Sequence, residues 1–137
     1  MNNSISCEFT VVKYQERSRR GATGNKIHSA HKKRKSRLGR NAIETKIDDE
    51  RKKIIRTRGG NIKIKAYSAN MINVSDVKKK KTTRVKIDGL EENKASVDYN
   101  RRNILTKGAI VKTKLGSVQI TSRPGQTGQI NGKLLDK

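Results

Sequence analysis

Residues 62–71 read Ile-Lys-Ile-Lys-Ala-Tyr-Ser-Ala-Asn-Met, and the first half of this stretch alternates apolar and basic side chains. A strand places successive side chains on opposite faces, so the alternation predicts a strand with one apolar and one basic face. At Tyr67 the phase changes, because Tyr67, Ala69 and Met71 now share a face. A phase change along one long strand indicates a bulge or bend, a feature that helps small barrels to close.

Shorter alternating runs follow towards the C-terminus. Their apolar or small side chains are Val85 and Ile87; Val111, Thr113 and Leu115; Val118 and Ile120; and Ile130, Gly132 and Leu134. Five to seven short strands at this spacing, without a convincing helical period, predict an all-β fold. We expect a small antiparallel β-barrel over residues 46–137, with a tight hairpin at Gly116-Ser117.

Turn sequences separate the predicted strands: Gly59-Gly60-Asn61, Asp88-Gly89, Lys107-Gly108 and Arg123-Pro124-Gly125. Proline fixes its own φ and glycine tolerates a positive φ, so Pro124-Gly125 predicts a type II turn. Gly128 and Gly132 are also interpreted as turn positions. The four lysines at 78–81 are expected to lie at the tip of a loop.

The N-terminal third of the chain has a different character. From Arg17 to Arg40 there are ten basic residues and no acidic one, and residues 15–45 hold only six apolar side chains. This apolar surface cannot offset the free energy of ordering the backbone, about 1–2 kcal/mol per residue. We expect residues 1–45 to form an extended basic arm that is mobile without a partner. A helix over residues 28–38 would have no apolar face to bury.

The chain of 137 residues has 34 Lys and Arg against 12 Asp and Glu, a net charge of +22. Such a charge strains a compact state and indicates a polyanionic partner, either nucleic acid or a charged membrane surface. The membrane is the weaker candidate, because no run of about 18 apolar residues and no lipidation signal is present. The N-terminus lacks the basic region of a signal peptide, and the lone Cys7 excludes an internal disulfide. We therefore expect a soluble, cytoplasmic protein.

Candidate catalytic or metal-binding residues are few. Asp48-Asp49-Glu50 could ligate Mg²⁺, but adjacent carboxylates fit better as a solvated turn that balances neighbouring cations. His28 and His31 have no further ligand in a strongly cationic segment. Cys7 has no base partner, and the sequence around Gly132-Lys133 departs from a phosphate-binding loop. We expect no enzyme activity, cofactor, metal or small-molecule substrate.

The basic segments indicate RNA in preference to DNA. Phe9, Tyr14, Tyr67 and Tyr99 are the only aromatic residues, too few to build stacking platforms for single strands. No helix-turn-helix, zinc finger or basic zipper that would enter a major groove can be drawn. We expect contacts with the phosphates, the 2′-hydroxyls and the shape of folded RNA.

The candidate RNA-binding residues are cations of the arm and of junctions in the barrel domain. In Arg56-Thr57-Arg58-Gly59-Gly60-Asn61, two arginines on one predicted strand face adjoin a Gly-Gly turn that lets the backbone approach a phosphate. Arg101-Arg102-Asn103 forms a comparable junction, and solvated arginines are the alternative at both places. The full set is Arg17, Arg19, Arg20, Lys26, Lys32, Lys33, Arg34, Lys35, Arg37, Arg40, Arg56, Arg58, Lys63, Arg101, Arg102 and Arg123.

Several motifs, in order, resemble one ribosomal protein family. They are Tyr14-Gln15-Glu16-Arg17-Ser18, Arg20-Gly21-Ala22-Thr23-Gly24, Lys32-Lys33-Arg34-Lys35 with Leu38-Gly39-Arg40, Arg56-Thr57-Arg58-Gly59-Gly60-Asn61, Tyr99-Asn100-Arg101-Arg102-Asn103-Ile104-Leu105-Thr106-Lys107-Gly108-Ala109 and Ser122-Arg123-Pro124-Gly125-Gln126-Thr127-Gly128. The family is the archaeal and eukaryotic e-type small-subunit protein eight, and the segment from Tyr99 is similar to its archaeal members. The resemblance covers about residues 13–135. It implies a structural constituent of the small subunit, a β-barrel with a basic extension that binds small-subunit rRNA beside neighbouring ribosomal proteins.

The chain departs from the family pattern at three places. Asn25 stands where the family usually has a glycine, Tyr14 replaces a usual tryptophan, and residues 1–12 resemble an added stretch. The closest alternative function is a ribosome-assembly factor that shares this domain and leaves before the subunit matures. A general DNA-compacting protein and an RNA-processing enzyme are weaker alternatives.

Overall fold

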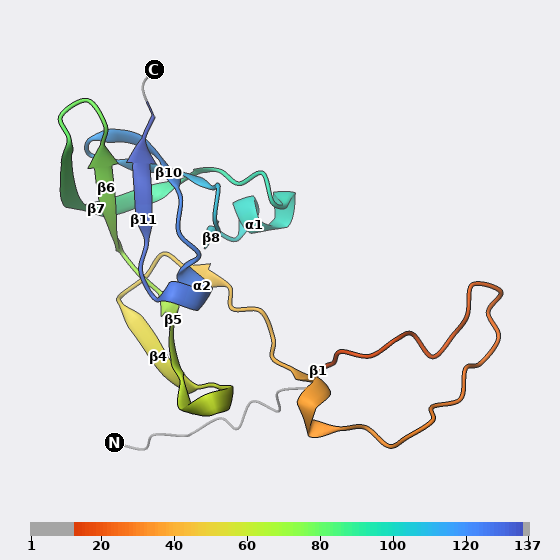
Figure 1. Cartoon of the computed structure of the whole chain (residues 1–137). Coiled ribbons are helices and arrows are strands. Elements are labelled where there is room, and N and C mark those ends of the chain that lie inside the picture. Colours follow the sequence, from red (N-terminus) through yellow and green to blue (C-terminus); the bar gives the residue numbers. More distant parts are fainter. Residues whose placement is uncertain (1–12, 136–137) are drawn as a thin grey trace, which may run out of the picture. The chain divides into compact units, whose positions relative to one another are not determined.

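A computed structural model describes residues 13–135 (Figure 1). The chain divides into two compact units, Met1–Ala42 and Ile43–Lys137. Cys7, Phe9 and the added stretch at 1–12 lie outside the described residues, as do residues 136 and 137. Within the part that is described, no helix has the length and apolar character needed to cross a membrane.

The described part of the first unit, which we call the arm loop (residues 13–42), folds back on itself. Strand β1 (Lys13–Tyr14) pairs antiparallel with β2 (Leu38–Gly39). The Gln15 N–H donates to the carbonyl oxygen of Arg37 at 2.9 Å beside this pair. Residues 28–38, where the sequence argued against a helix, contain only one 3-10 turn, η1 (Lys35–Arg37). The segment therefore forms a closed loop where one extended arm was expected.

A second constriction lies inside the arm loop. Arg20 and Lys26 form an isolated antiparallel bridge, and the Gly21 N–H donates to the Asn25 carbonyl oxygen at 2.9 Å. Gly24 completes the turn with a φ of 81°, a conformation that glycine adopts without steric cost. No residue between 13 and 42 is buried, so hydrogen bonds and ion pairs, and not a hydrophobic core, shape this unit.

The second unit contains a closed five-stranded barrel, as the sequence predicted. In order around the barrel its strands are β10 (Gly116–Ile120), β11 (Asn131–Leu134), β6 (Met71–Asp76), β7 (Lys81–Glu92) and β9 (Ile110–Thr113). All neighbouring strands are antiparallel except β11 and β6, which run parallel. The all-β prediction is confirmed, with this one parallel pair as a difference.

The barrel interior is filled by the alternating apolar residues of its strands. Its fully buried side chains include Ile72, Val74, Ile87, Val111, Val118 and Ile120. Gly132, expected from the sequence at a turn, is instead buried inside β11. A Cβ at this position would lie 2.5 Å from Val118 Cγ1 and 3.0 Å from the Gln119 carbonyl oxygen. The barrel is therefore so narrow here that only glycine fits.

A four-stranded sheet forms the rest of the second unit. Its order is β4 (Arg51–Arg56), β5 (Ile62–Ser68), β3 (Thr45–Lys46) and β8 (Ile104–Leu105). Thr45, assigned to the arm from the sequence, is buried here, and its hydroxyl donates to the Ala66 carbonyl oxygen at 2.8 Å.

The phase change at Tyr67 coincides with the predicted bulge: Lys52 lies opposite Ala66 and Arg51 opposite Ser68, so Tyr67 is an extra residue in β5. Strand β5 ends at Ser68, and after Ala69 and Asn70 the chain enters the barrel as β6, in the other sheet. The bulge therefore lies in β5, just before the chain passes from one sheet to the other, and the single long strand that was expected is divided into β5 and β6. Ile62 and Ile64 are 65% and 43% exposed, so the apolar face of β5 is buried only towards Ala66.

Two predicted turns in the barrel are wrong in position. Asp88-Gly89 lies within β7, where the register with β9 is irregular between Ile87 and Gly89. The β9–β10 hairpin turns at Lys114-Leu115, which leaves Leu115 51% exposed, while Gly116-Ser117 already belongs to β10. Lys107-Gly108 forms a turn as expected.

Two single-turn helices were not predicted as helices. Pro124 occupies the first position of α2 (Pro124–Thr127), and the positive φ that was expected at Gly125 falls at Gly128, where the helix ends. Proline suits the first helical turn as well as a type II turn, so local preference does not separate the two. Helix α1 (Val97–Arg101) begins after Ser96, whose hydroxyl accepts a hydrogen bond from the Asp98 N–H at 3.2 Å.

Substitution of Gly132 by alanine tests the narrow barrel. We expect Gly132→Ala to lower the free energy of unfolding by about 1–3 kcal/mol, because the added methyl group overpacks the interior against backbone. Gly89→Ala is the matched control, since Gly89 also lies in a barrel strand but has open space where the methyl group would lie. Urea unfolding of both variants measures the difference, and equal stabilities would contradict the packing described.

Candidate nucleic-acid interface

All ten candidate cations of the first unit are exposed on the arm loop. They are Arg17, Arg19, Arg20, Lys26, Lys32, Lys33, Arg34, Lys35, Arg37 and Arg40. Arg37 pairs with Glu16, the one acidic residue of the arm loop, at 2.9 Å. The Lys33 ammonium lies 4.7 Å from the centre of the Tyr14 ring, close enough for a cation–π contact. These two contacts lie at the closed end of the loop and leave its cations facing outwards.

The motif Arg56-Thr57-Arg58-Gly59-Gly60-Asn61 forms the tip of the β4–β5 hairpin. Arg56 ends β4, whereas Arg58 begins the 3-10 turn η2 (Arg58–Gly60), so the two arginines do not share a strand face as expected. Gly59 and Gly60 have φ of 79° and 78°, which glycine accommodates without strain. The Thr57 N–H and hydroxyl both donate to the Asn61 carbonyl oxygen, at 2.7 and 2.9 Å, and close the turn.

The register of the β4–β5 hairpin shows which side chains share each of its two faces. Ile54 lies opposite Ile64, and Arg56 opposite Ile62, on the first face. The second face, which we call the lysine face, carries Lys53, Lys63 and Lys65. Lys53 lies directly opposite Lys65, so two ammonium groups share this part of the lysine face. Lys63 was predicted as a site residue; Lys53 and Lys65, which the sequence analysis did not select, share its face, and strand alternation with hairpin register would have placed them there.

The later glycine-rich motif packs against this hairpin. Helix α2 contacts β5, and a Cβ at Gly128 would lie 2.6 Å from Ile64 Cγ2. The close approach of the two elements thus depends on glycine at this position. Arg123 lies immediately before α2 with an exposed side chain, so the fold brings the Arg123–Gly128 segment beside the strand that follows the first motif.

The junction at Arg101 and Arg102 is engaged in ion pairs within the chain. Arg102 contacts the carboxylate of Glu44 and donates to Asp98 Oδ2 at 3.3 Å, while Arg101 pairs with Asp98 at 3.0 Å. Hydrogen bonds from the guanidinium to Glu44, and then to Asp98, raise the pKa of Arg102 above its ordinary value. Arg102 therefore ties α1 to the segment before β3, whereas the Arg101 side chain remains 81% exposed.

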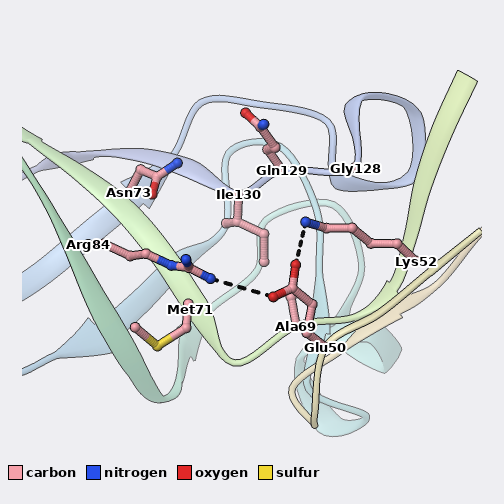
Figure 2. Close-up of a pocket in the computed structure, with 9 residues that line it drawn as sticks. All are labelled: Glu50, Lys52, Ala69, Met71, Asn73, Arg84, Gly128, Gln129 and Ile130. Carbon is pink, nitrogen blue, oxygen red and sulfur yellow. Dashed lines mark hydrogen bonds and ion pairs between the residues drawn. The ribbon is translucent and has the colours of Figure 1, made fainter.

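The acidic cluster at 48–50 divides between two settings. Asp48 and Asp49 are exposed in a bend, and Glu50 lies beside the barrel, where Lys52 and Arg84 contact its carboxylate (Figure 2). The hydrogen bond and charge of Lys52 are the main causes that lower the pKa of Glu50. Between residues 13 and 135, no group of three or more His, Cys, Asp or Glu side chains is placed to hold a metal ion.

Comparison with known proteins decides the family. The family described as Ribosomal protein S8e matches residues 14–135, almost all of the described chain. The chain belongs to this family. The resemblance seen in the sequence motifs is thereby confirmed, and membership of a ribosomal protein family agrees with the prediction that the chain is not an enzyme.

Three archaeal relatives, each named small ribosomal subunit protein eS8, illustrate the match. The Haloquadratum walsbyi protein is 44% identical over 125 residues, which cover 91% of this chain and 98% of the relative. The Methanocorpusculum labreanum protein is 46% identical over 90% of this chain and 98% of its own length. The Methanococcus maripaludis protein is 46% identical over 89% of this chain and 96% of its own length. The arm loop from Tyr14 onwards, the hairpin motif and α2 all lie within the range matched by the family.

The ion pair of Glu50 gives a pH-dependent test. We expect the Glu50 carboxyl to titrate below its ordinary pKa of 4.5 in carbon-detected NMR, because Lys52 stabilises the ionised form. A pKa lowered by folding means that the pair contributes its full stability above pH 4.5 and loses it as the pH falls through the lowered value. Lys52→Met should raise the pKa, and Lys53→Met, on the opposite face, should leave it unchanged. A wild-type midpoint at or above 4.5 would refute the pairing.

Proposed function

We propose that this protein is a structural constituent of the small ribosomal subunit that binds ribosomal RNA through two cationic surfaces, the arm loop and the β4–β5 hairpin. The observation that carries the proposal is the arm loop: ten exposed cations and no carboxylate between Arg17 and Arg40, in a member of a ribosomal protein family. The names of its archaeal relatives support the small subunit in particular.

The arm loop contributes affinity through its charge. Each Lys or Arg that contacts a phosphate releases condensed counterions from the RNA, which favours binding at low salt. The β1–β2 pair and the Arg20–Lys26 bridge already bring distant parts of the loop together. Folding has therefore already restricted the conformations of the arm loop. RNA binding then costs less conformational entropy than the ordering of a fully flexible segment would.

The hairpin contributes a surface that can approach the RNA backbone closely. Gly59 and Gly60 carry no side chains at the tip, and exposed Arg58 lies next to them. A guanidinium offers a phosphate two parallel hydrogen bonds, which gives orientation as well as affinity. The lysine face adds positive charge that attracts phosphates. Arg123, beside β5, extends the same surface.

The distribution of aromatic residues supports recognition by backbone and shape. Tyr14 and Tyr67 are only 38% and 37% exposed, and the Tyr14 ring already faces Lys33. Stacking on several successive bases needs more exposed rings than these. On this proposal the protein resides on cytoplasmic ribosomes beside other ribosomal proteins. An assembly factor would instead leave before maturation, so stable residence in mature small subunits separates the two functions.

A fourfold charge change in the arm loop tests the first surface. We expect replacement of Lys32, Lys33, Arg34 and Lys35 by glutamine to make the plot of log K against log salt shallower, by about 0.7–0.9 for each phosphate that is no longer neutralised. The measurement is titration of a small-subunit rRNA fragment at three salt concentrations. Glutamine at the four exposed lysines 78–81 removes the same charge and serves as control, with an expected smaller change. Equal slopes for the two variants would show that the arm loop has no special part in binding.

Two arginines with the same charge but different surroundings test the second surface. We expect Arg58→Ala to weaken rRNA binding about tenfold or more, because it removes a charge-assisted hydrogen bond to phosphate. Arg102→Ala should change the affinity little, because Glu44 and Asp98 occupy its guanidinium. Filter binding at one fixed salt concentration measures both. A larger loss for Arg102→Ala than for Arg58→Ala would contradict the assignment.

A further inference from the structure

A cavity of about 220 Å³ lies in the second unit, and Figure 2 shows the residues that line it. Strands β4, β6 and β7 and the segment after α2 contribute to its wall. Ala69, Met71 and Ile130 supply apolar surface, and Ala69 and Ile130 are 7% and 3% exposed. Asn73 and Arg84 supply polar groups on the barrel side. Polar groups therefore make up most of the cavity wall, and Met71 with the small exposed parts of Ala69 and Ile130 forms its apolar part.

The charges at the rim restrict what the cavity can hold. Glu50 is in contact with both Lys52 and Arg84, so one carboxylate stands between two cations. A small anion placed at the carboxylate is repelled by Glu50, and a small cation is repelled by Lys52 and Arg84. An uncharged planar group with hydrogen-bond donors on its edge avoids both penalties. A nucleobase has this chemistry.

We propose that the cavity holds a single guanine base that is turned out of the RNA, with the Glu50 carboxylate as its acceptor. This inference rests on the proposed RNA-binding function. Unstacked bases are read by hydrogen bonds to their edges and by packing against apolar or aromatic side chains. Among the four RNA bases, guanine alone presents two adjacent N–H donors on its Watson–Crick edge, N1–H and N2–H₂. A carboxylate, which has two oxygens and only accepts, matches that pair.

The contacts already made by Glu50 leave room for this role. Its two oxygens face different cations, with Lys52 at Oε1 and Arg84 at Oε2, at 3.5 Å in the second case. Each carboxylate oxygen has a further lone pair, and the side chain is 40% exposed. Lys52 also keeps the pKa of Glu50 low, so the group remains an acceptor at neutral pH. Adenine would place a ring nitrogen acceptor against this carboxylate, which is repulsive.

The test uses Met71 as a reporter inside the cavity. The chain has two methionines, Met1 and Met71, so labelling the methionine methyl groups with ¹³C gives a simple spectrum of the full-length protein. We expect GMP to shift the Met71 signal at a concentration about tenfold lower than AMP does, in line with the discrimination of a bidentate base contact. Glu50→Gln should abolish the preference, because an amide turns one acceptor into a donor. Glu92→Gln, an exposed carboxylate of β7, should retain it.

The same samples separate this inference from the proposed function. Equal responses to GMP and AMP, or no response of Met71 to GMP, would overturn the guanine site while rRNA binding persists. Failure of the wild-type protein to bind rRNA would instead overturn the function on which it rests. The wild-type comparison of GMP with AMP needs no substitution, so the test stands even where Glu50→Gln does not fold.

Discussion

Mutual repulsion among 34 lysines and arginines is the constraint to which the rest of this structure responds. The chain has few carboxylates, and several of them form ion pairs that hold separate segments together. Glu16 closes the arm loop through Arg37, and Glu44 and Asp98 hold Arg102 between β3 and α1. Glu50 joins β4 to the barrel strand β7 through Arg84. Ion pairs as exposed as these contribute little stability each. Their main effect is on position: they fix which cations are occupied within the chain and which face outwards.

The two units contribute different physical properties. The barrel gains its stability from buried β-branched side chains such as Ile72 and Val118, and its interior is narrow enough to require Gly132. The arm loop buries no residue between 13 and 42, and its shape depends on backbone hydrogen bonds and two contacts at its base. A rigid barrel unit with a weakly held cationic loop suits RNA, since phosphates can supply the ordering free energy that apolar burial does not.

Alternation with period two was enough to predict the barrel, because a half-buried strand leaves this pattern in the sequence. Alternation could not show whether another element covers the apolar face of a strand. Ile62 and Ile64 alternate as regularly as Val118 and Ile120 do, yet Ile62 and Ile64 remain exposed. Pro124-Gly125 fits a turn and a helix start equally, and the packing of α2 on β5 decides between them. The ion pair of Arg102 with Glu44 joins residues 58 apart, and the cavity beside Glu50 draws on three strands. Such features follow from tertiary structure alone and leave no local pattern.

The most direct test of rRNA binding by the two cationic surfaces is protein–RNA cross-linking in mature, salt-washed small subunits, with mass spectrometry of the cross-linked peptides. We expect the protein to remain in these subunits, with cross-links within residues 17–40 and on the hairpin at residues 53–65. Absence of the protein from mature subunits would contradict its role as a structural constituent. Cross-links confined to the exposed lysine loop at residues 78–81 would contradict the assignment of the two surfaces.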